Sequence, residues 1–318
     1  MVSREEFINY VKKTIKQEDH NELNKNKTRY NGIRYTALVV GLVLLVWFII
    51  DITKGGLFAL YDKFAITKGF FAAFALVIFA IITFYRSAVI KSFGSEYKKQ
   101  FVDYLLQDTT HTYEENGIVN EEMFRKTGLG MDYKIYTGED KLTLNIPNDD
   151  GTDSEVYLEI GDVCASVIVE DDDGSTRKVP RFNGCFGFVK FPQNFNCHLT
   201  LNRGTWMNRK KMEKVDLEDI KFSQEFGVKA SDQIEARYIL TPDLMQKLCE
   251  LKSRVKSLEI IFADNMMYIG MSRRQLFNLG LQKKDQGAES MFLRYYDDIE
   301  ILLSIVKEIQ TNNKVFKM

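Results

Sequence analysis

Proline, cysteine and histidine are all scarce in this chain. Its 318 residues include 4 Pro, 4 Cys and 3 His. Four thiols with no Cys-x-x-Cys pair do not make the disulfide framework of a small secreted protein, so we expect free thiols in a reducing compartment. The histidines are scattered, and Cys197 and His198 form the one local Cys/His pair. Neighbours on a strand point to opposite faces, so we predict no metal site.

The chain also lacks an excess of charge of either sign. Lys and Arg number 43, Asp and Glu number 44, and the formal net charge is -1. A nucleic-acid-binding protein is expected to be basic, so we predict no nucleic-acid partner. The charge is unevenly distributed, because a basic segment at 1–34 offsets a mildly acidic remainder from residue 86 onward.

Motifs that carry chemistry are missing as well. The sequence has no phosphate-binding or dinucleotide-binding glycine loop, no Gly-x-Ser-x-Gly elbow, no kinase signature and no His-Glu-x-x-His helix. Asp297–Asp298 is an acidic pair, but adjacent helical residues do not face each other, so we predict a solvated helix face there. The sequence therefore predicts neither a catalytic residue nor a cofactor.

Two long uncharged runs stand out from this composition. Residues 35–50 and 69–85 carry no charge, and with their flanks they give candidate membrane spans at about 35–53 and 67–86. A spanning helix needs roughly 17–25 residues. Both runs are apolar around the whole helix circumference, which favours membrane spans over buried core helices. We therefore predict a transmembrane hairpin at 35–90.

The distribution of basic residues predicts the orientation of this hairpin. Residues 1–34 hold eight Lys and Arg, whereas the connecting segment 51–68 holds three. Cytoplasmic flanks collect Lys and Arg. We therefore predict a two-span membrane protein with both termini cytoplasmic and the lipid bilayer as a partner. Neither uncharged run, 35–50 or 69–85, contains a charged group, so the hairpin is interpreted as an anchor and not as an ion pathway.

The first residues predict a short amphipathic helix. Ser3 and Glu6 fit a capping box, and Phe7, Val11 and Ile15 follow on one helical face. This basic segment could dock on a membrane surface, on a partner or on the protein's own cytosolic domain. Another helix is predicted to include 97–105, and a loop is predicted at 109–120.

From about residue 130 the apolar period changes from helical to alternating. Period-two alternation predicts strands with one buried face. Asp-Gly turns at 148–151 and 171–174 lie between these strands and predict hairpins. Neither turn fits the calcium loop of an EF-hand. The alternating positions are Leu142, Leu144, Ile146, Val156, Leu158, Ile160, Val163, Ala165, Val167 and Val169.

The C-terminal part mixes strands and helices. We predict strands at 233–240, 258–262 and 266–270, a helix capped by Thr241 with Pro242 as its first residue, and a last helix at about 288–310. The predicted fold class is α+β. A basic amphipathic N-terminal segment (1–34) with a short helix and a two-helix transmembrane hairpin (35–90) precede a cytosolic domain (92–318), which has a mainly antiparallel sheet and flanking helices.

Three stretches carry a resemblance to a known family. They are the aromatic-glycine stretch 182–188, the segment 222–232 and its continuation 235–242. With the two apolar runs, they resemble the bacterial membrane proteins catalogued as domain of unknown function 3137. The resemblance implies a protein of the bacterial inner membrane with a cytosolic α+β domain, and it makes a LemA-like membrane protein a candidate partner. It implies no catalytic residue.

The segment 222–242 also holds the candidate site residues. Asp232, Glu235 and Arg237 form a charged group that is either a buried ion pair or a contact for a ligand or partner. Phe222 and Phe226 are predicted to anchor the core. Basic residues at 273–274 and 283–284 form a small patch that contacts lipid or an acidic partner, or is a solvated loop.

These observations favour a membrane-anchored, non-enzymatic binding or scaffold protein. Its cytosolic domain is expected to recognise a protein partner or to form a homo-oligomer. Two alternatives stay open at this point. One is an enzyme with an unfamiliar site in the cytosolic domain, and the other is a channel or transporter subunit formed by oligomerising the hairpin.

Overall fold

The computed structural model of the chain divides into two compact units. Unit 1 comprises Met1–Phe7, Lys99–Asn278 and Leu293–Met318, and unit 2 comprises Ile8–Lys98 and Leu279–Phe292. The structure describes residues 1–15, 32–33, 35–47, 49–50, 53, 63–147, 155–171, 174–201, 212–272, 276–277, 288–312 and 316, with the side chains of 63–69, 72 and 85–96 left out.

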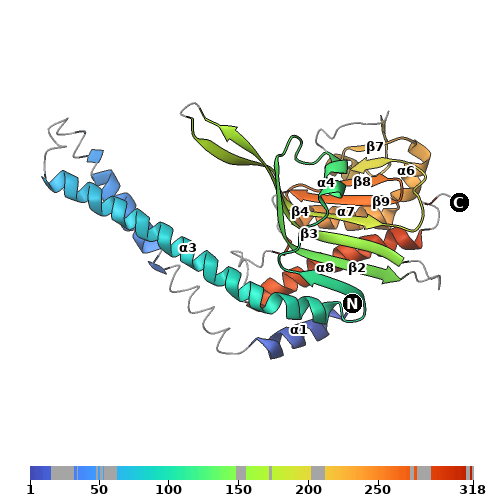
Figure 1. Cartoon of the computed structure of the whole chain (residues 1–318), viewed down its shortest axis with the longest axis horizontal. Helices are drawn as coiled ribbons and strands as arrows, with labels where there is room; N and C mark the ends of the chain where they lie inside the picture. The colour runs from blue at the N-terminus through green and yellow to red at the C-terminus, as the bar shows by residue number, and fades with distance from the viewer. Residues whose placement is uncertain are drawn as a thin grey trace. The chain divides into compact units, whose positions relative to one another are not determined.

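Unit 1 is built on an antiparallel β-sheet (Figure 1). In the described residues it has nine strands in the order β1-β2-β3-β4-β9-β8-β5-β7-β6. The strands are β1 (Thr110–Glu114), β2 (Ile135–Pro147), β3 (Glu155–Glu170), β4 (Thr176–Lys190), β5 (Leu199–Leu201), β6 (Glu213–Lys214), β7 (Val228–Ala230), β8 (Glu259–Ala263) and β9 (Met266–Ser272).

Alternating apolar residues form the buried face of this sheet, as predicted. Leu144 on β2 pairs with Leu158 on β3, and Ile146 pairs with Val156. All four side chains are buried, whereas residues between them are more exposed. One face of each strand therefore contributes to the core because successive side chains point to opposite sides.

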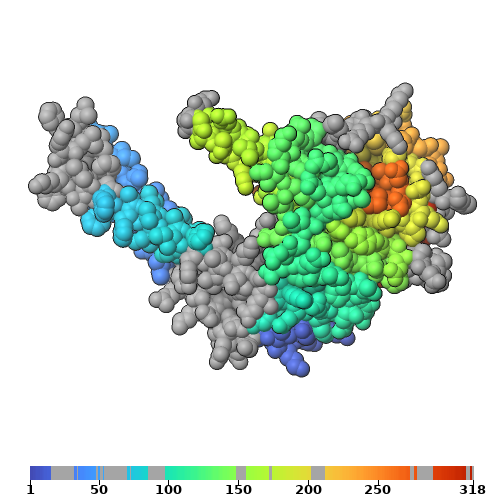
Figure 2. Space-filling view, in the orientation of Figure 1, coloured from blue at the N-terminus to red at the C-terminus, as the bar shows by residue number. Residues whose placement is uncertain are grey.

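Strands β3 and β4 continue past their neighbours as a two-stranded arm (Figure 2). The last β3 residue paired with β2 is Ser166, but pairing with β4 continues to Glu170. Asp171 N donates to Ser175 O at 2.8 Å, and Gly174 has φ +79°. These contacts confirm the hairpin turn predicted at 171–174. The other predicted turn, 148–151, lies outside the described residues.

Helices accompany both units, and the two that were predicted in the C-terminal part are confirmed. The helix capped by Thr241 is α7, and the last helix extends one residue beyond its predicted end. The helices are α1 (Arg4–Thr14), α3 (Lys63–Leu105), α4 (Glu121–Thr127), α5 (Ile220–Glu225), α6 (Gln233–Ile239), α7 (Pro242–Arg254) and α8 (Ala288–Thr311).

An aromatic cluster packs between α4 and one face of the sheet. Phe124 of α4 is fully buried, and its ring lies 5.2 Å from that of Phe182 and 5.0 Å from that of Phe186. A Cβ atom at Gly187 would lie 2.9 Å from the side chain of Ile160. The aromatic-glycine stretch thus has a packing role, because rings fill one face while glycine permits close approach on the other.

Two local predictions were wrong. Residues 233–240 are helical as α6 and do not form a strand, because the Asp232 side chain caps the backbone N–H groups of Ile234 and Glu235. The predicted loop at 109–120 contains β1, which pairs with β2 along its whole length. Both errors come from short segments, in which local pattern is weak and tertiary contacts decide the conformation.

The N-terminal helix begins with the predicted capping box. Ser3 N donates to Glu6 Oε2 at 3.0 Å, and Glu6 N donates to Ser3 Oγ at 3.3 Å. Within unit 1, Phe7 packs against Phe101 and Tyr296, with ring centroids 6.0 and 5.2 Å away. The amphipathic helix therefore forms, and its first turns pack on the unit 1 core. Most of the basic segment that follows lies outside the described residues.

Unit 2 presents apolar helices with exposed side chains. Residues 35–47 are helical, as is α3. Phe84 is 78% exposed and Phe70 is 70% exposed. A Cβ atom added at Gly41 would lie 3.4 Å from the side chain of Ala75, so the two helical segments approach each other there. That contact leaves most of their apolar surface uncovered.

The predicted transmembrane hairpin is overturned by the structure. None of the helices in the described ranges is both long enough and apolar enough to cross a membrane. The predictions of a two-span topology and of an inner-membrane location with cytoplasmic termini are therefore contradicted. The connecting segment 51–62, apart from residue 53, lies outside the described residues.

Candidate functional site

The three predicted site residues all lie on or beside α6. Asp232 is the N-cap of this helix, and its Oδ1 atom accepts hydrogen bonds from Ile234 N at 2.8 Å and from Glu235 N at 3.1 Å. Capping satisfies backbone donors that have no partner inside the helix. The Asp232 carboxylate therefore has a structural role in starting α6.

The other two residues tie α6 to neighbouring segments. The Glu235 carboxylate accepts a hydrogen bond from Asn196 Nδ2 at 2.9 Å. Arg237 donates from Nη2 to Asp216 O at 3.0 Å and from Nη1 to Gln233 O at 3.4 Å. None of these hydrogen bonds joins Asp232, Glu235 or Arg237 to another of the three. The buried-ion-pair interpretation is therefore not supported by a contact among the described side chains. A ligand contact at α6 stays a prediction.

Cys197 lies close to this acidic group but is not an activated thiol. Its side chain is buried. Burial, together with the charges of Asp232 and Glu235, raises the pKa of the Cys197 thiol to about 12. The thiolate is the nucleophile and the metal ligand, so a protonated thiol suits neither role. No cluster of three or more His, Cys, Asp or Glu that could hold a metal ion occurs in the described part of the chain.

A groove between α5 and α7 is the better candidate. Asp219 caps α5 by accepting a hydrogen bond from Phe222 N at 2.9 Å. Thr241 caps α7 by accepting one from Leu244 N at 3.1 Å, and Pro242 is at the start of that helix. Proline is tolerated there because the first N–H groups of a helix have no partner inside it. Local sequence thus fixes where both walls of the groove begin.

Buried residues hold these two helices against the rest of unit 1. The rings of Phe222 and Phe226 lie 4.7 Å apart, and both side chains are almost fully buried, as predicted. On α7 the buried residues are Leu244, Leu248 and Leu251. Their spacing of four and three residues marks one face of a helix. The opposite face of α7 is consequently free to line the groove.

The groove has a volume of about 910 Å³. This lies near the upper end of the range of ligand pockets, roughly 300–1,000 Å³. The helical face that α7 turns toward it consists of Met245, Gln246, Cys249, Glu250 and Ser253.

Charges of both signs alternate along the groove. Asp219 and Lys221 lie two residues apart on the α5 wall, and Glu225 follows at the end of that helix. On the α7 wall, Glu250 and Lys252 are likewise two residues apart. A ligand of a single charge would meet like charges here. The lining instead suits a surface that also carries both signs.

The thiol in this groove is not activated either. Burial, and to a lesser degree the charges of Asp219 and Glu225, raise the pKa of Cys249 above its usual value, against an opposing effect of Lys221. A protonated thiol cannot start acyl transfer or bind a metal effectively. The groove thus offers a shaped, mixed surface and lacks an activated thiol.

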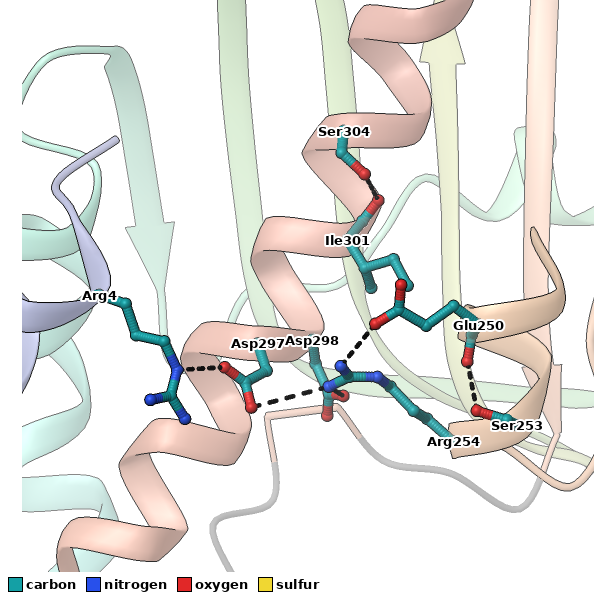
Figure 3. A network of polar contacts seen from close by, with 8 residues as sticks. All are labelled: Arg4, Glu250, Ser253, Arg254, Asp297, Asp298, Ile301 and Ser304. Atoms are coloured by element: carbon teal, nitrogen blue, oxygen red, sulfur yellow. Dashed lines mark hydrogen bonds and ion pairs between the residues drawn. The ribbon is translucent and has the colours of Figure 1, made fainter. Parts of the chain in front are cut away.

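An ion-pair network includes Glu250 of the groove lining (Figure 3). Arg254 Nη2 donates to Glu250 Oε1 at 2.8 Å, and its Nη1 lies 3.7 Å from Asp298 Oδ1. Arg4 Nε donates to Asp297 Oδ1 at 3.1 Å. The predicted solvated face at 297–298 was wrong for Asp298, whose residue is 3% exposed. Sequence reasoning missed this network because its partners come from three separate helices.

Comparisons with known proteins give a limited result. Residues 180–311 match the family described as "Protein of unknown function (DUF3137)", which supports the predicted family label for that part of the chain. No curated protein matches the chain. Among solved structures, the crystal structure of the mycobacterial trehalose monomycolate transport factor A, TtfA, is 9% identical with a TM-score of 0.31, covering 63% of this chain and 92% of that chain. At this TM-score the similarity carries no argument.

Proposed function

We propose that this chain is a non-enzymatic binding or scaffold protein and that the α5–α7 groove receives its protein partner. The groove itself is the observation that carries the proposal. It has a volume of about 910 Å³ and combines apolar lining with charges of both signs. Burial raises the pKa of its Cys249 thiol, which disfavours the reactive thiolate. Such a lining supports recognition better than bond-breaking chemistry.

The length of the groove favours a protein segment over a small molecule. Its α7 lining extends from Pro242 to Val255, including the residue that follows the helix. At 1.5 Å per helical residue this is roughly 20 Å. Grooves of this kind recognise a helix through side chains spaced three and four residues apart. This length supports a folded or helical protein surface as the partner.

The decisive experiment compares the wild-type chain with a groove variant. Full-length protein is purified in mild detergent, which keeps the exposed apolar side chains of unit 2 covered, and the mass and composition of the complex are measured by native mass spectrometry. We expect a stoichiometric partner or an oligomer. Met245→Glu should remove it by placing a charge among apolar groove residues.

Ile234→Glu serves as the matched control. Ile234 is 64% exposed on α6 and does not line the groove. This variant should keep the complex intact. A wild-type chain that is strictly monomeric and free of partners contradicts the proposal, as does a complex that survives Met245→Glu.

A further inference from the structure

The first residues of the chain pack on α8. Val2 O accepts a hydrogen bond from Tyr296 Oη at 3.1 Å, and the ring of Phe7 lies 5.2 Å from that of Tyr296. Arg4 extends this contact, because its Nε donates to Asp297 Oδ1 at 3.1 Å. The N-terminal segment, residues 1–7, is therefore held by consecutive residues of α8.

Residues 297 and 298 of α8 also face α7. Asp298 Oδ1 lies 3.7 Å from Nη1 of Arg254 at the end of α7, and Asp297 Oδ2 lies 3.9 Å from the same nitrogen. Asp297 is thus shared between Arg4 and Arg254 (Figure 3). The Asp298 side chain is 5% exposed, so solvent screens these charges less than it screens an exposed surface pair.

Arg254 connects this cluster with the groove. Its Nη2 donates to Glu250 Oε1 at 2.8 Å, and Glu250 lines the groove beside Cys249. The contacts of Arg254 with α8, at 3.7 and 3.9 Å, are longer than hydrogen bonds. The guanidinium is therefore hydrogen-bonded to the groove carboxylate, while two carboxylates of α8 attract it from another side.

Arg4 limits the attraction that α8 exerts on this guanidinium. Its positive charge offsets the charge of Asp297, and its hydrogen bond occupies one carboxylate oxygen. When Arg4 leaves, both oxygens of Asp297 become available to Arg254. A guanidinium binds a carboxylate most strongly through two parallel hydrogen bonds. Arg254 then turns toward α8 and leaves Glu250 as a charged group in the groove.

We propose that the N-terminal segment controls the charge of the α5–α7 groove through Arg4, Asp297 and Arg254. With the segment packed on α8, Arg254 neutralises Glu250; with the segment released, the groove gains a free carboxylate. Arg254 is thus a positioning residue for Glu250. The inference rests on the proposed function, since it names the regulation of that groove: release of the segment favours a partner that presents a basic group there.

The test measures the charge beside Glu250 and needs no partner. The partly exposed thiol of Cys249 lines the groove next to Glu250. Full-length protein in mild detergent is treated with a cationic aminoethyl or an anionic sulfonatoethyl methanethiosulfonate, and peptide mass spectrometry gives the rate at Cys249. Both reagents attack the same thiolate, so the ratio of the two rates cancels the thiolate fraction and reports local charge.

Arg4→Gln is expected to raise the cation-to-anion ratio at least about twofold, because Glu250 loses its partner. Arg254→Gln should raise it as well, and Glu250→Gln should remove the response to Arg4→Gln. Combining Arg4→Gln with Asp297→Asn should restore the wild-type ratio, because residue 297 then no longer competes for Arg254. Simple detachment of the N-terminal segment would not be reversed by this second substitution.

Arg177→Gln serves as the matched control. Arg177 Nε donates to Asp171 Oδ1 at 2.9 Å, a contact of the same type at the turn of the two-stranded arm, and its loss should leave the ratio at Cys249 unchanged. An unchanged ratio in Arg4→Gln overturns the proposal. An equal change in Arg177→Gln overturns it too, as does a raised ratio that persists in the double variant.

The outcomes also separate this inference from the proposed function. Native mass spectrometry of the same variants reports the complex independently of the ratio. A complex that is lost in Met245→Glu, together with a ratio indifferent to Arg4→Gln, rejects the regulation and leaves the groove as a binding site. A ratio that responds as expected in a chain without any partner rejects the proposed function and supports the control of charge.

Discussion

Phenylalanine has opposite surroundings in the two units. In unit 1, Phe124 is fully buried and its ring packs near those of Phe182 and Phe186. In unit 2, Phe70 and Phe84 are 70% and 78% exposed. The same side chain therefore stabilises one unit from within, whereas in the other it forms surface. Hydrophobicity alone does not decide burial; the arrangement of apolar residues around each element does.

The reason lies in the pattern of the sequence. Helix α7 has buried leucines on one face and polar residues on the other. Packing of that one face against the rest of unit 1 therefore covers its apolar stripe. The helices of unit 2 have apolar residues on all sides. One neighbouring helix, as at Gly41 and Ala75, covers only a part of that circumference. Large exposed apolar patches on a protein usually mark a surface that contacts something else.

The largest expected effect compares one phenylalanine from each unit. Phe124→Ala should lower the free energy of unfolding by about 3–5 kcal/mol, because it removes a fully buried ring and leaves a cavity. Phe84→Ala should change it by less than about 0.5 kcal/mol. Urea unfolding followed by hydrogen exchange of β3 and β4 measures both. Equal losses from the two variants would break the comparison.

A buried carboxylate tests how much unit 1 depends on satisfied polar groups. Asp162 is 2% exposed and accepts hydrogen bonds from Leu276 N at 2.8 Å and Phe277 N at 3.2 Å. Asp162→Ala leaves these donors unpaired and should cost about 1–3 kcal/mol. Faster amide exchange at 276 and 277 is the specific readout. The exposed Glu170 on the same strand is the control, and a similar loss in Glu170→Ala would argue against this role.

Glu259 gives a pH-dependent prediction. Burial raises the pKa of its carboxyl group above the usual value of 4.5, and Oε2 is buried without a hydrogen-bond partner among the described residues. The folded protein thus binds this proton more tightly than the unfolded chain does. The associated stability is present below the unfolded pKa and is lost as pH rises through the folded pKa.

Glu259→Gln removes this titration. It should stabilise unit 1 by about 1 kcal/mol at neutral pH, where the wild-type carboxylate is unfavourably buried. The gain should vanish at pH values below 4.5, the usual pKa, because both side chains are then neutral. Thermal unfolding across this pH range measures the difference. A gain that is constant with pH would contradict the burial argument.

The smallest effect on folding is expected for substitutions in unit 2. These substitutions should nevertheless change the surface properties of the protein. Replacing Phe70, Ile81 and Phe84 together by serine should leave the unfolding of unit 1 unchanged within about 0.5 kcal/mol. It should reduce the binding of a hydrophobic dye and of detergent, because these side chains are more than half exposed. Unchanged dye binding would show that this surface is already covered in solution.

Much of unit 1 follows from local pattern. Period-two alternation predicts β2 and β3, and the Thr241–Pro242 start predicts α7, because these signals are long or involve specific backbone chemistry. The same alternation predicts a strand at 233–240, and there it misleads. The cap at Asp232 and burial of Ala236 and Ile239 make this segment a helix instead. In such short segments, tertiary contacts outweigh the pattern.

The candidate site was harder to predict than the fold. Asp232, Glu235 and Arg237 attract attention in the sequence as a charged group, but the structure gives them contacts that hold α6 in place. The groove between α5 and α7 has no motif. Its residues are separated in the sequence and meet only because Phe222 and Leu248 are buried on the opposite sides of their helices. No spacing rule finds such a surface.

The sequence by itself determined the scarcity of histidine and cysteine, the near-zero net charge, the uncharged runs and the alternating strands of unit 1. Those features are local, and their physical meaning depends only on residue type and period. Tertiary structure decided which charges pair, as between Arg254 and Asp298, and which thiols are buried. It also decided where two helices leave a groove, because side chains from distant segments must be brought together before their chemistry can combine.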